Sequence, residues 1–208
     1  MPMSDAACQL KITLHGSKPP IWRRVIVPYE LTLEQLHYVI QAAMGWYNCH
    51  LHAFVVAGQQ FSGPAPDGSE DDSDEFSDEC AYRLADLPLK EKMKFRYEYD
   101  FGDGWRHDIV LEKMVPPLTT GSRIACTGGK MCCPMEDSGG IWGHYNNLEV
   151  LANTKHPDHA MLLEWYGGPF DPEAFDLQAV NVRLRQLQIP RGDRAASRRV
   201  RKQVWDFS

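Results

Sequence analysis

Aromatic and charged residues alternate along residues 94–101, and a second alternating stretch follows at residues 105–112. Gly102-Asp103-Gly104 separates the two stretches. A period of two on both sides of a glycine-bracketed turn indicates two antiparallel strands joined as a hairpin. A three-residue turn would set the pairing of these strands. The predicted cross-strand pairs are Phe101–Trp105, Tyr99–His107, Tyr97–Ile109 and Phe95–Leu111 on one face, and Asp100–Arg106 and Lys94–Glu112 on the other.

The N-terminal part of the chain carries similar patterns. Apolar and polar residues alternate at residues 8–14, and residues 21–27 are rich in β-forming side chains, so both are predicted strands. Thr32 with Gln35 three residues later forms a capping box, and the apolar stripe beyond it predicts a helix. A second hairpin is predicted at residues 51–62, around Ala57-Gly58.

The C-terminal half is predicted to be irregular from Pro116-Pro117 to Tyr145, and then helical. Two short helices are expected at about residues 147–153 and 157–166. Asp171-Pro172-Glu173 has the pattern of a helix start, which predicts a last helix ending near Leu187. Its predicted inward residues are Phe175, Ala179, Val182 and Leu187. The whole pattern predicts an α+β fold, a mostly antiparallel sheet of hairpins with one early crossing helix, as in β-grasp folds, and a C-terminal helical segment.

Charge divides the chain into a single predicted domain, residues 1–190, and a basic C-terminal tail, residues 191–208. An acidic loop, residues 64–80, is predicted to be solvated within that domain. Its carboxylates would suit calcium, but the regular ligand spacing of a calcium loop is missing. The tail is predicted to be a solubilising extension or, alternatively, a weak contact for nucleic acid or an acidic partner.

Composition narrows the classes of protein that remain. The chain of 208 residues has 43% hydrophobic and 24% charged residues, which is ordinary for a soluble globular protein. No apolar run approaches a membrane span, no secretory signal is visible, and the six cysteines are too scattered for a disulfide scaffold. A cytoplasmic protein is therefore expected. The net charge of -6 argues against the body being a general nucleic-acid binder.

A metal-binding constellation could form around His50 and His52, which share one face of a predicted strand. The groups that could complete such a site, if the glycine-rich segment folds over the hairpin, are Asp100, Asp103, His107, Glu136 and Asp137. The leading metal candidates are His50, His52, Asp103 and His107. Such nitrogen and oxygen ligands suit zinc, manganese or iron. The alternative is a polar cluster of hydrogen-bonded histidines, tyrosines and carboxylates.

Two further groups of residues could carry chemistry. Arg23 and Arg24 could hold a phosphate or carboxylate, but they lie on opposite faces of a strand, and at least one is expected to pair with Glu136 or Asp137. The complete set of candidates for a ligand pocket is Arg23, Arg24, Tyr99, Asp100, Asp103, Trp105 and His107. The cysteines at 126, 132 and 133 lack the spacing of zinc knuckles, so packed thiols are favoured over a zinc or redox site.

Five motifs then occur in order along the chain. They are I-W-R-R at 21–24, L-x-x-L-H-x-x-I-Q-x-x-M-G-W at 33–46, H-L-H-x-F at 50–54, Y-x-Y-D-F-G-D-x-W-x-H at 97–107 and C-P-x-E-D-x-G-G at 133–140. In these motifs the chain resembles the plasmid pRiA4b ORF-3-like family. The resemblance implies Cys126 and Cys133 as a recurrent pair that could form a weaker thiol site. His144 departs from the family pattern and adds a candidate ligand.

No complete catalytic set appears in the sequence. Some members of this family are labelled resolvase-like, yet Ser4 and Ser17 lack the arginine surroundings of a recombinase nucleophile. The predicted function is a non-catalytic binding or accessory module associated with plasmids or mobile elements, with an unknown protein or small molecule as partner and no membrane. One alternative is a metal-dependent hydrolase, using zinc or manganese, with Glu136 or Asp137 as general base. A second is weak nucleic-acid binding through the basic tail.

Overall fold

One sheet of eight strands dominates the computed structural model, which describes residues 6–63, 76–119 and 122–188. In spatial order the strands are β5-β4-β3-β6-β7-β1-β2-β8, and every neighbouring pair is antiparallel except β4 and β5. Their bounds are β1 Ala7–Leu14, β2 Trp22–Pro28, β3 His52–Val56, β4 Gln59–Ser62, β5 Ser77–Asp78, β6 Lys94–Tyr99, β7 Trp105–Val115 and β8 Ala125–Lys130. The helices are α1 Leu33–Met44, α2 Gly140–Ala152, α3 His159–Trp165 and α4 Leu177–Gln186, with a 3-10 turn at Leu84–Asp86. The predicted α+β class is confirmed.

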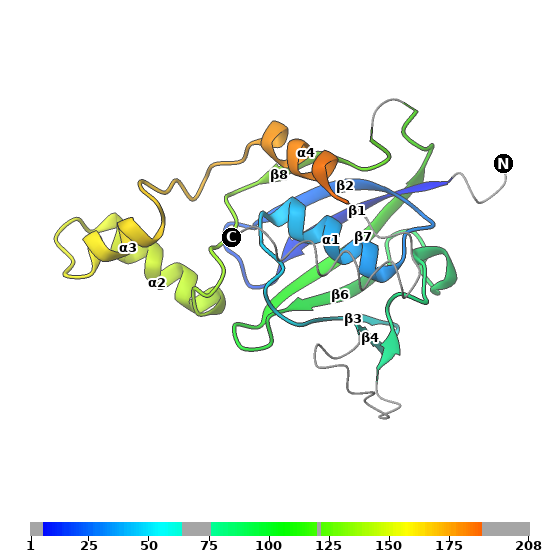
Figure 1. Cartoon of the computed structure of the whole chain (residues 1–208), viewed down its shortest axis with the longest axis horizontal. Helices are drawn as coiled ribbons and strands as arrows, with labels where there is room; N and C mark the ends of the chain where they lie inside the picture. The colour runs from blue at the N-terminus through cyan, green and yellow to red at the C-terminus, as the bar shows by residue number, and fades with distance from the viewer. Residues whose placement is uncertain (1–5, 64–75, 120–121, 189–208) are drawn as a thin grey trace.

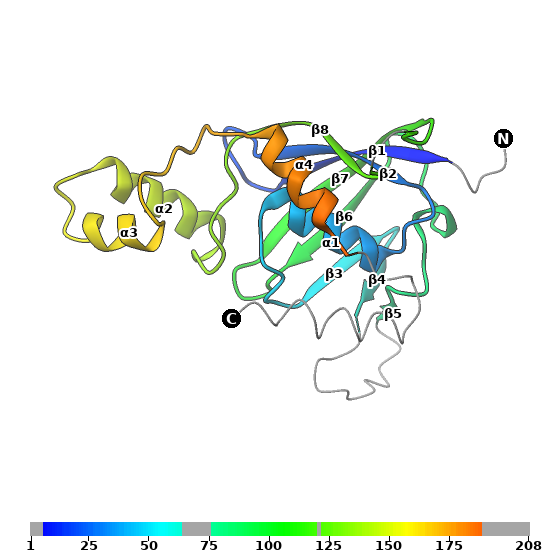
Figure 2. The ribbon, with the colours of Figure 1, turned by 45° about the horizontal axis from the view of Figure 1, so that its top comes forward.

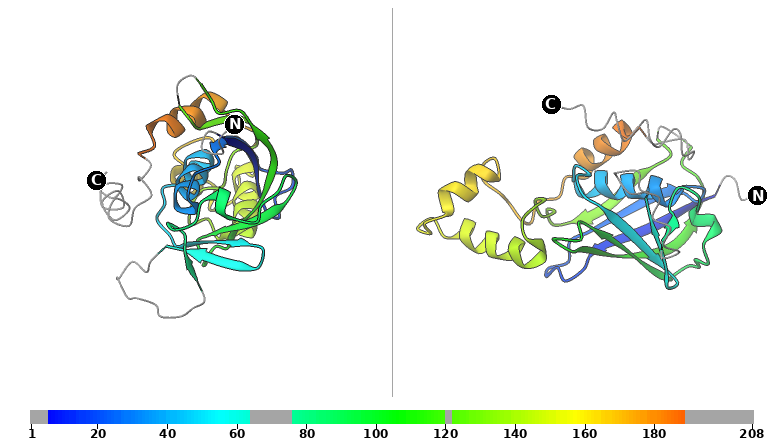
Figure 3. Two further views of the ribbon diagram at one scale, coloured as in Figure 1. Left: turned by 90° about the vertical axis from the view of Figure 1, so that its right-hand side faces the viewer. Right: turned by 60° about the horizontal axis from the view of Figure 1, so that its bottom comes forward.

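Helix α1 lies against the inner face of the curved sheet, and α4 packs beside it and β8 (Figures 1 and 3). The predicted capping box is present, because Gln35 N donates to Thr32 Oγ1 at 3.2 Å and Thr32 N donates to Gln35 Oε1 at 3.0 Å. The helix ends at Gly45, which adopts a left-handed conformation with φ 91°. All but one of its residues are buried, so α1 forms the centre of the core.

The main hairpin has a longer turn than predicted. Tyr99 pairs with Trp105 and Tyr97 pairs with His107, so residues 100–104 form a five-residue turn. Asp100 causes the difference: it adopts φ 55°, and its Oδ1 accepts hydrogen bonds from the backbone of Gly102 at 3.0 Å and Asp103 at 3.3 Å. The predicted register is wrong by two residues, but an even shift keeps the side chains of the two strands on their predicted faces. Phe101, predicted to pair with Trp105, instead lies in the turn and is exposed.

The predicted polar pairs across the hairpin are also wrong as a consequence. Arg106 lies opposite Glu98 instead of Asp100, and their side chains approach to 3.6 Å. Lys94 lies opposite Val110 instead of Glu112. Glu112 instead binds an arginine of β2, described below.

The C-terminal half is more regular than predicted. Residues expected to be irregular form strand β8, and α2 already begins at Gly140. The last helix begins later than predicted, at Leu177, because Asp176 Oδ1 caps it by accepting from the backbone of Gln178 and Ala179 at 2.8 and 2.9 Å. Asp171 closes only a local turn, through Glu173 N at 2.9 Å. The inward face was also wrong in part, since the buried residues are Val180 and Leu184 and Val182 is exposed.

The acidic loop is not wholly solvated, because its C-terminal end is part of the fold. Ser77–Asp78 forms β5, while Glu79 and Cys80 are buried. Residues 64–75 of that loop, and the predicted basic tail, lie outside the described residues. No helix within the described ranges is long and apolar enough to cross a membrane.

Helices α2 and α3 pack on each other and project to one side of the sheet, away from α1 and α4 (Figures 1 and 2). We call this pair the helical arm. It is joined to the body near β1, where Tyr145 Oη donates to Lys18 O at 3.1 Å and Ile141 packs against Gly16. The segment that leads into the arm passes the turn of the main hairpin, where the candidate site lies.

Candidate metal-binding site at the hairpin turn

Three segments that are distant in sequence meet at the turn of the main hairpin. His50 comes from the loop after α1, Asp100 begins the turn, and Asp137 belongs to the segment before α2. His50 Nε2 lies 3.0 Å from Asp137 Oδ1 and 3.7 Å from Asp100 Oδ2. The three ligand atoms all lie within 4.8 Å of one another, so one ion could contact all of them.

Glu136 attaches the glycine-rich segment to the rest of the site. The hydroxyl of Tyr99 donates to Glu136 Oε1, and Tyr47 N donates to Glu136 Oε2 at 2.8 Å. The same hydroxyl accepts from Cys49 N at 2.8 Å. Burial and the Glu136 carboxylate both raise the pKa of Tyr99, so its hydroxyl keeps the proton that it donates. Glu136 is thereby held in place next to Asp137.

Asp103 provides a second attachment between the same two segments. Its Oδ2 accepts from Gly139 N at 3.0 Å. Gly140, with φ 67°, packs directly on the carbonyl of Asp103, where a Cβ atom would come far closer than real Cβ contacts allow. Glycine at position 140 is therefore required for the close approach of the two segments.

Two of the three candidate ligands have an unusual backbone conformation. Asp100 and Asp137 are both left-handed, with φ 55° and 57°. This conformation costs a residue other than glycine roughly 1 kcal/mol or more, although aspartate tolerates it better than most. Residues held in such conformations cluster at functional sites. Both candidate carboxylates thus come from strained positions.

The chemistry of the cluster fits a divalent ion that accepts mixed ligands. One imidazole nitrogen and two carboxylates suit zinc or manganese. His50 Nε2 is shielded from solvent and forms no aligned hydrogen bond, even though Asp137 Oδ1 is near. Asp100 is largely buried, whereas the side chain of Asp137 is 70% exposed, so the cluster opens to solvent on one side.

The other predicted metal ligands lie elsewhere. His52 binds Glu79 Oε2 at 2.8 Å and stacks on His37, with ring centroids 3.5 Å apart. His107 is fully buried against Trp46, and this burial lowers its pKa to about 3, so it is neutral. Asp103 is engaged by Gly139. Of the four leading candidates, only His50 belongs to the close cluster, while Asp100 and Asp137 had been named as completing groups.

The polar chain from Glu79 through His52 to His37 is of the kind given as the alternative to a metal site, but Glu79 and His37 were not named as its members. His37 continues it to Tyr97 Oη at 2.7 Å and Asn48 Oδ1 at 2.6 Å. The role of Glu79 could not be predicted, because this residue lies at the end of a long acidic run and its sequence context does not distinguish it from the other carboxylates. A histidine in a buried helix stripe, as at position 37, was the available hint.

The two adjacent arginines do not reach the hairpin turn. Arg23 is buried and donates to the carbonyls of Ala43 and Lys130 at 3.2 and 3.0 Å and to Cys133 Sγ at 3.0 Å. Arg24 makes a bidentate pair with Glu112 at 2.7 and 2.9 Å. The predicted pairing of one arginine with Glu136 or Asp137 is therefore wrong. Trp105, another pocket candidate, is buried beside Trp46.

All six cysteines are free thiols. Cys126 Sγ donates to Gly128 O at 3.3 Å, and Cys133 Sγ contacts Met44 Sδ at 3.3 Å. Burial raises the pKa of Cys133 to about 11 despite the nearby Arg23, so this thiol is protonated at neutral pH. His144, the added candidate ligand, is buried in α2, and burial lowers its pKa to about 4.

Fold and site together define a class of protein with a curved antiparallel sheet, a helix in its concave side and a hairpin turn closed by a glycine-rich segment. The model of the family described as "Plasmid pRiA4b ORF-3-like protein" matches residues 6–179, and the chain belongs to this family. The resemblance carried by the five sequence motifs is confirmed.

Two relatives support the assignment. The chain is 37% identical over 187 residues to "Uncharacterized protein y4hQ" of Sinorhizobium fredii (strain NBRC 101917 / NGR234), covering 89% of this chain and 94% of that protein. It is similar, with a TM-score of 0.75 and 36% identity, to the solved structure titled "Crystal Structure of Protein of Unknown Function MM3350 from Methanosarcina mazei Go1". That match covers 84% of this chain and 96% of the other.

Proposed function

We propose that this protein is a binding module that holds a divalent metal ion, zinc or manganese, between His50, Asp100 and Asp137. The observation that carries the proposal is the convergence of their ligand atoms within 4.8 Å of one another. The shielded His50 Nε2 beside two carboxylates, without an aligned hydrogen bond, supports it. An ion would also offset the repulsion between the two carboxylates.

Binding is favoured over hydrolysis by the state of the candidate general base. Both oxygens of Glu136 already accept hydrogen bonds, from the Tyr99 hydroxyl and from Tyr47 N. A general base must be able to reach a water proton, and Glu136 instead holds the loop in place. Asp137 would be a ligand of the ion. An accessory role for this module in plasmid or mobile-element biology is what the family's description suggests.

The test is metal binding by the full chain after treatment with a chelator. Titration calorimetry with Zn²⁺ and Mn²⁺ should show one site. Ion at about one hundred times its Kd should stabilise the fold by about 2.7 kcal/mol. His50→Ala should abolish both effects. His15→Ala is the matched control, because His15 is exposed and approaches a single carboxylate, Asp108, at 3.1 Å. Equal binding by both variants would contradict the proposal.

A further inference from the structure

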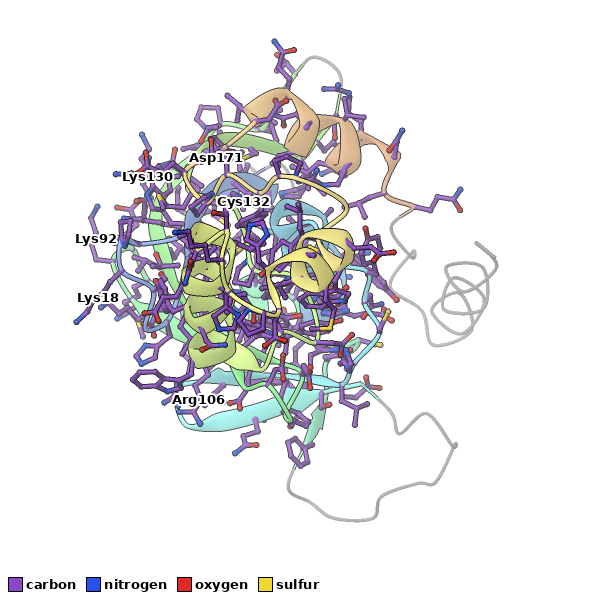
Figure 4. All side chains as sticks on the ribbon, turned by 90° about the vertical axis from the view of Figure 1, so that its left-hand side faces the viewer. Lys18, Lys92, Arg106, Lys130, Cys132 and Asp171 are labelled. Atoms are coloured by element: carbon purple, nitrogen blue, oxygen red, sulfur yellow. The ribbon has the colours of Figure 1, made fainter. Side chains whose placement is uncertain are left out.

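The outer face of the sheet turns away from α1 and α4, and the described helices leave it open (Figure 3). We define the outer sheet face as the outward side chains of β6, β7, β1, β2 and β8, which alternate with the buried residues of those strands. Figure 4 shows two of its residues, Lys130 and Arg106, projecting on the same side of the molecule. This face is independent of the hairpin-turn site.

Strand register places most cations of this face in two neighbouring rows, whereas Arg106 lies outside both rows, opposite Glu98. Lys94 lies opposite Val110, which lies opposite Lys11, which lies opposite Arg24. Neighbouring strands are about 4.8 Å apart, so this row spans about 14 Å. The next row runs from Arg96 through Asp108 and Thr13 to Trp22, and it extends to Lys130 on β8.

Trp22 is the aromatic centre of these rows. The ammonium of Lys11 lies 5.2 Å from the indole centroid and the guanidinium of Arg24 lies 5.0 Å from it. Lys130 is its direct cross-strand neighbour. The indole packs on Gly128 of β8, and its nearest atom is 3.6 Å from the position of a Cβ there, an ordinary contact distance. The indole is only half-buried, so part of it faces solvent.

Most cations of the outer sheet face are not neutralised by carboxylates. Glu112 is taken by Arg24, and Asp108 approaches His15. Among the described residues, none of four cations has a carboxylate within 4.0 Å: Lys11, Lys94, Arg96 and Lys130. A face on which four cations lack a carboxylate within 4.0 Å, around a half-buried indole, is complementary to a ligand that carries both phosphates and flat rings.

We infer that the outer sheet face binds single-stranded nucleic acid, with a base stacked on Trp22 and phosphates held by Lys11, Lys94 and Lys130. Open sheets with aromatic side chains bind unpaired bases by stacking, and the cations follow the backbone. Duplex is a poorer fit, because bases inside a duplex cannot stack on a side chain of a sheet. The net charge of -6 opposes any polyanion, so the binding is weak and salt-dependent, with Kd on the order of 10⁻⁵ M.

The test uses the full chain and a fluorescein-labelled dT20 oligonucleotide at about 50 mM salt. Fluorescence anisotropy should report binding, and Trp22→Ala should weaken it about tenfold, since one stacked base is lost. Trp22→Phe should retain most of the affinity. Trp142→Ala is the matched control, because Trp142 lies on the helical arm and is 85% exposed. Lys11→Gln and Lys130→Gln should each lower the slope of log K against log salt by about 0.7.

Several outcomes would overturn the inference. They are Trp22→Ala binding like wild type, heparin binding as tightly as dT20, or duplex DNA binding more tightly. Loss of binding in Trp142→Ala equal to that in Trp22→Ala would also do so. If the affinity arose only from the basic C-terminal residues, Trp22→Ala and Lys11→Gln would bind dT20 as tightly as the wild type, which would also overturn the inference. The His50→Ala variant should bind dT20 as tightly as the wild type. Failure of the metal-binding proposal can therefore be distinguished from failure of the nucleic-acid inference.

Discussion

At the scale of single residues, the Tyr99 hydroxyl connects all parts of the hairpin-turn site. It donates to Glu136 and accepts from Cys49 N, next to His50. It therefore fixes the loop that carries His50 and the segment that carries Asp137 at the same time. Because neither contact involves a candidate metal ligand directly, Tyr99 positions the ligands without being one.

Tyr99→Phe should weaken metal binding about tenfold and lower the free energy of unfolding by about 1 kcal/mol, since the half-buried carboxylate of Glu136 loses a donor. Calorimetric titration and urea unfolding measure the two effects. Tyr47→Phe is the matched control: the Tyr47 side chain is 75% exposed and only its backbone N binds Glu136. If the two variants behave alike, the positioning role of the Tyr99 hydroxyl is wrong.

At the scale of elements, the contact between the hairpin turn and the segment before α2 depends on Gly140. The residue needs a left-handed backbone and has the Asp103 carbonyl against it. Gly58, in the turn between β3 and β4, has a similar φ of 86° with nothing within 4 Å of the Cβ position. A comparison of Gly140 with Gly58 therefore separates the free-energy cost of backbone strain from that of the steric clash with Asp103.

Gly140→Ala should lower the free energy of unfolding by about 3 kcal/mol, and Gly58→Ala by only about 1 kcal/mol, because the second variant adds strain alone. Chemical denaturation measures both values. The first variant should also lose metal affinity, since displacing Gly139-Gly140 moves Asp137. Equal destabilisation by the two substitutions would show that the close approach to Asp103 does not matter.

Elements with strong local signals could be predicted from the sequence. The capping box located α1, and period-two alternation located β1, β6 and β7. Residues with high β-propensity located β2, and the hairpin predicted around Ala57-Gly58 located β3 and β4. The turn length of the main hairpin could not be predicted, because it depends on the left-handed Asp100 and its side-chain hydrogen bonds. The start of the last helix was predicted at Asp171, whereas the residue that caps α4 is Asp176.

At the scale of the whole molecule, buried neutral histidines make stability depend on pH. Burial lowers the pKa of His107 to about 3 and of His144 to about 4, below the ordinary value of 6.5. In the unfolded chain both rings take up protons as the pH falls below about 6.5, whereas in the folded chain they stay neutral until the lower values. The unfolded state then binds more protons, so stability is lost as the pH falls.

The free energy of unfolding should therefore fall between pH 6.5 and pH 4, with each of the two histidines contributing up to about 1.4 kcal/mol per pH unit. His144→Leu should reduce this slope. Urea unfolding at pH 7, 6 and 5 measures the slope. A slope that His144→Leu does not alter would contradict the assignment.

The candidate site as a whole was only partly predictable. The sequence indicated His50, Asp100 and Asp137 among a longer set of groups, and the condition that the glycine-rich segment must fold over the hairpin is met. The sequence could not show that His50 belongs to the cluster and His52 does not. His50 precedes β3 and His52 begins it, but the partners of His52 are Glu79 and His37. Which residues converge depends on contacts between segments that are distant along the chain.

The separation of His50, Asp100 and Asp137 along the chain has a kinetic consequence. An ion held by all three would act as a cross-link that ties the loop after α1, the hairpin and the entry to the helical arm. Such a link can form only after these segments have docked, which is late in folding, so it would contribute little to the folding rate. The ion would instead slow the opening of the native state, and the protein's lifetime under proteolysis would follow the supply of metal.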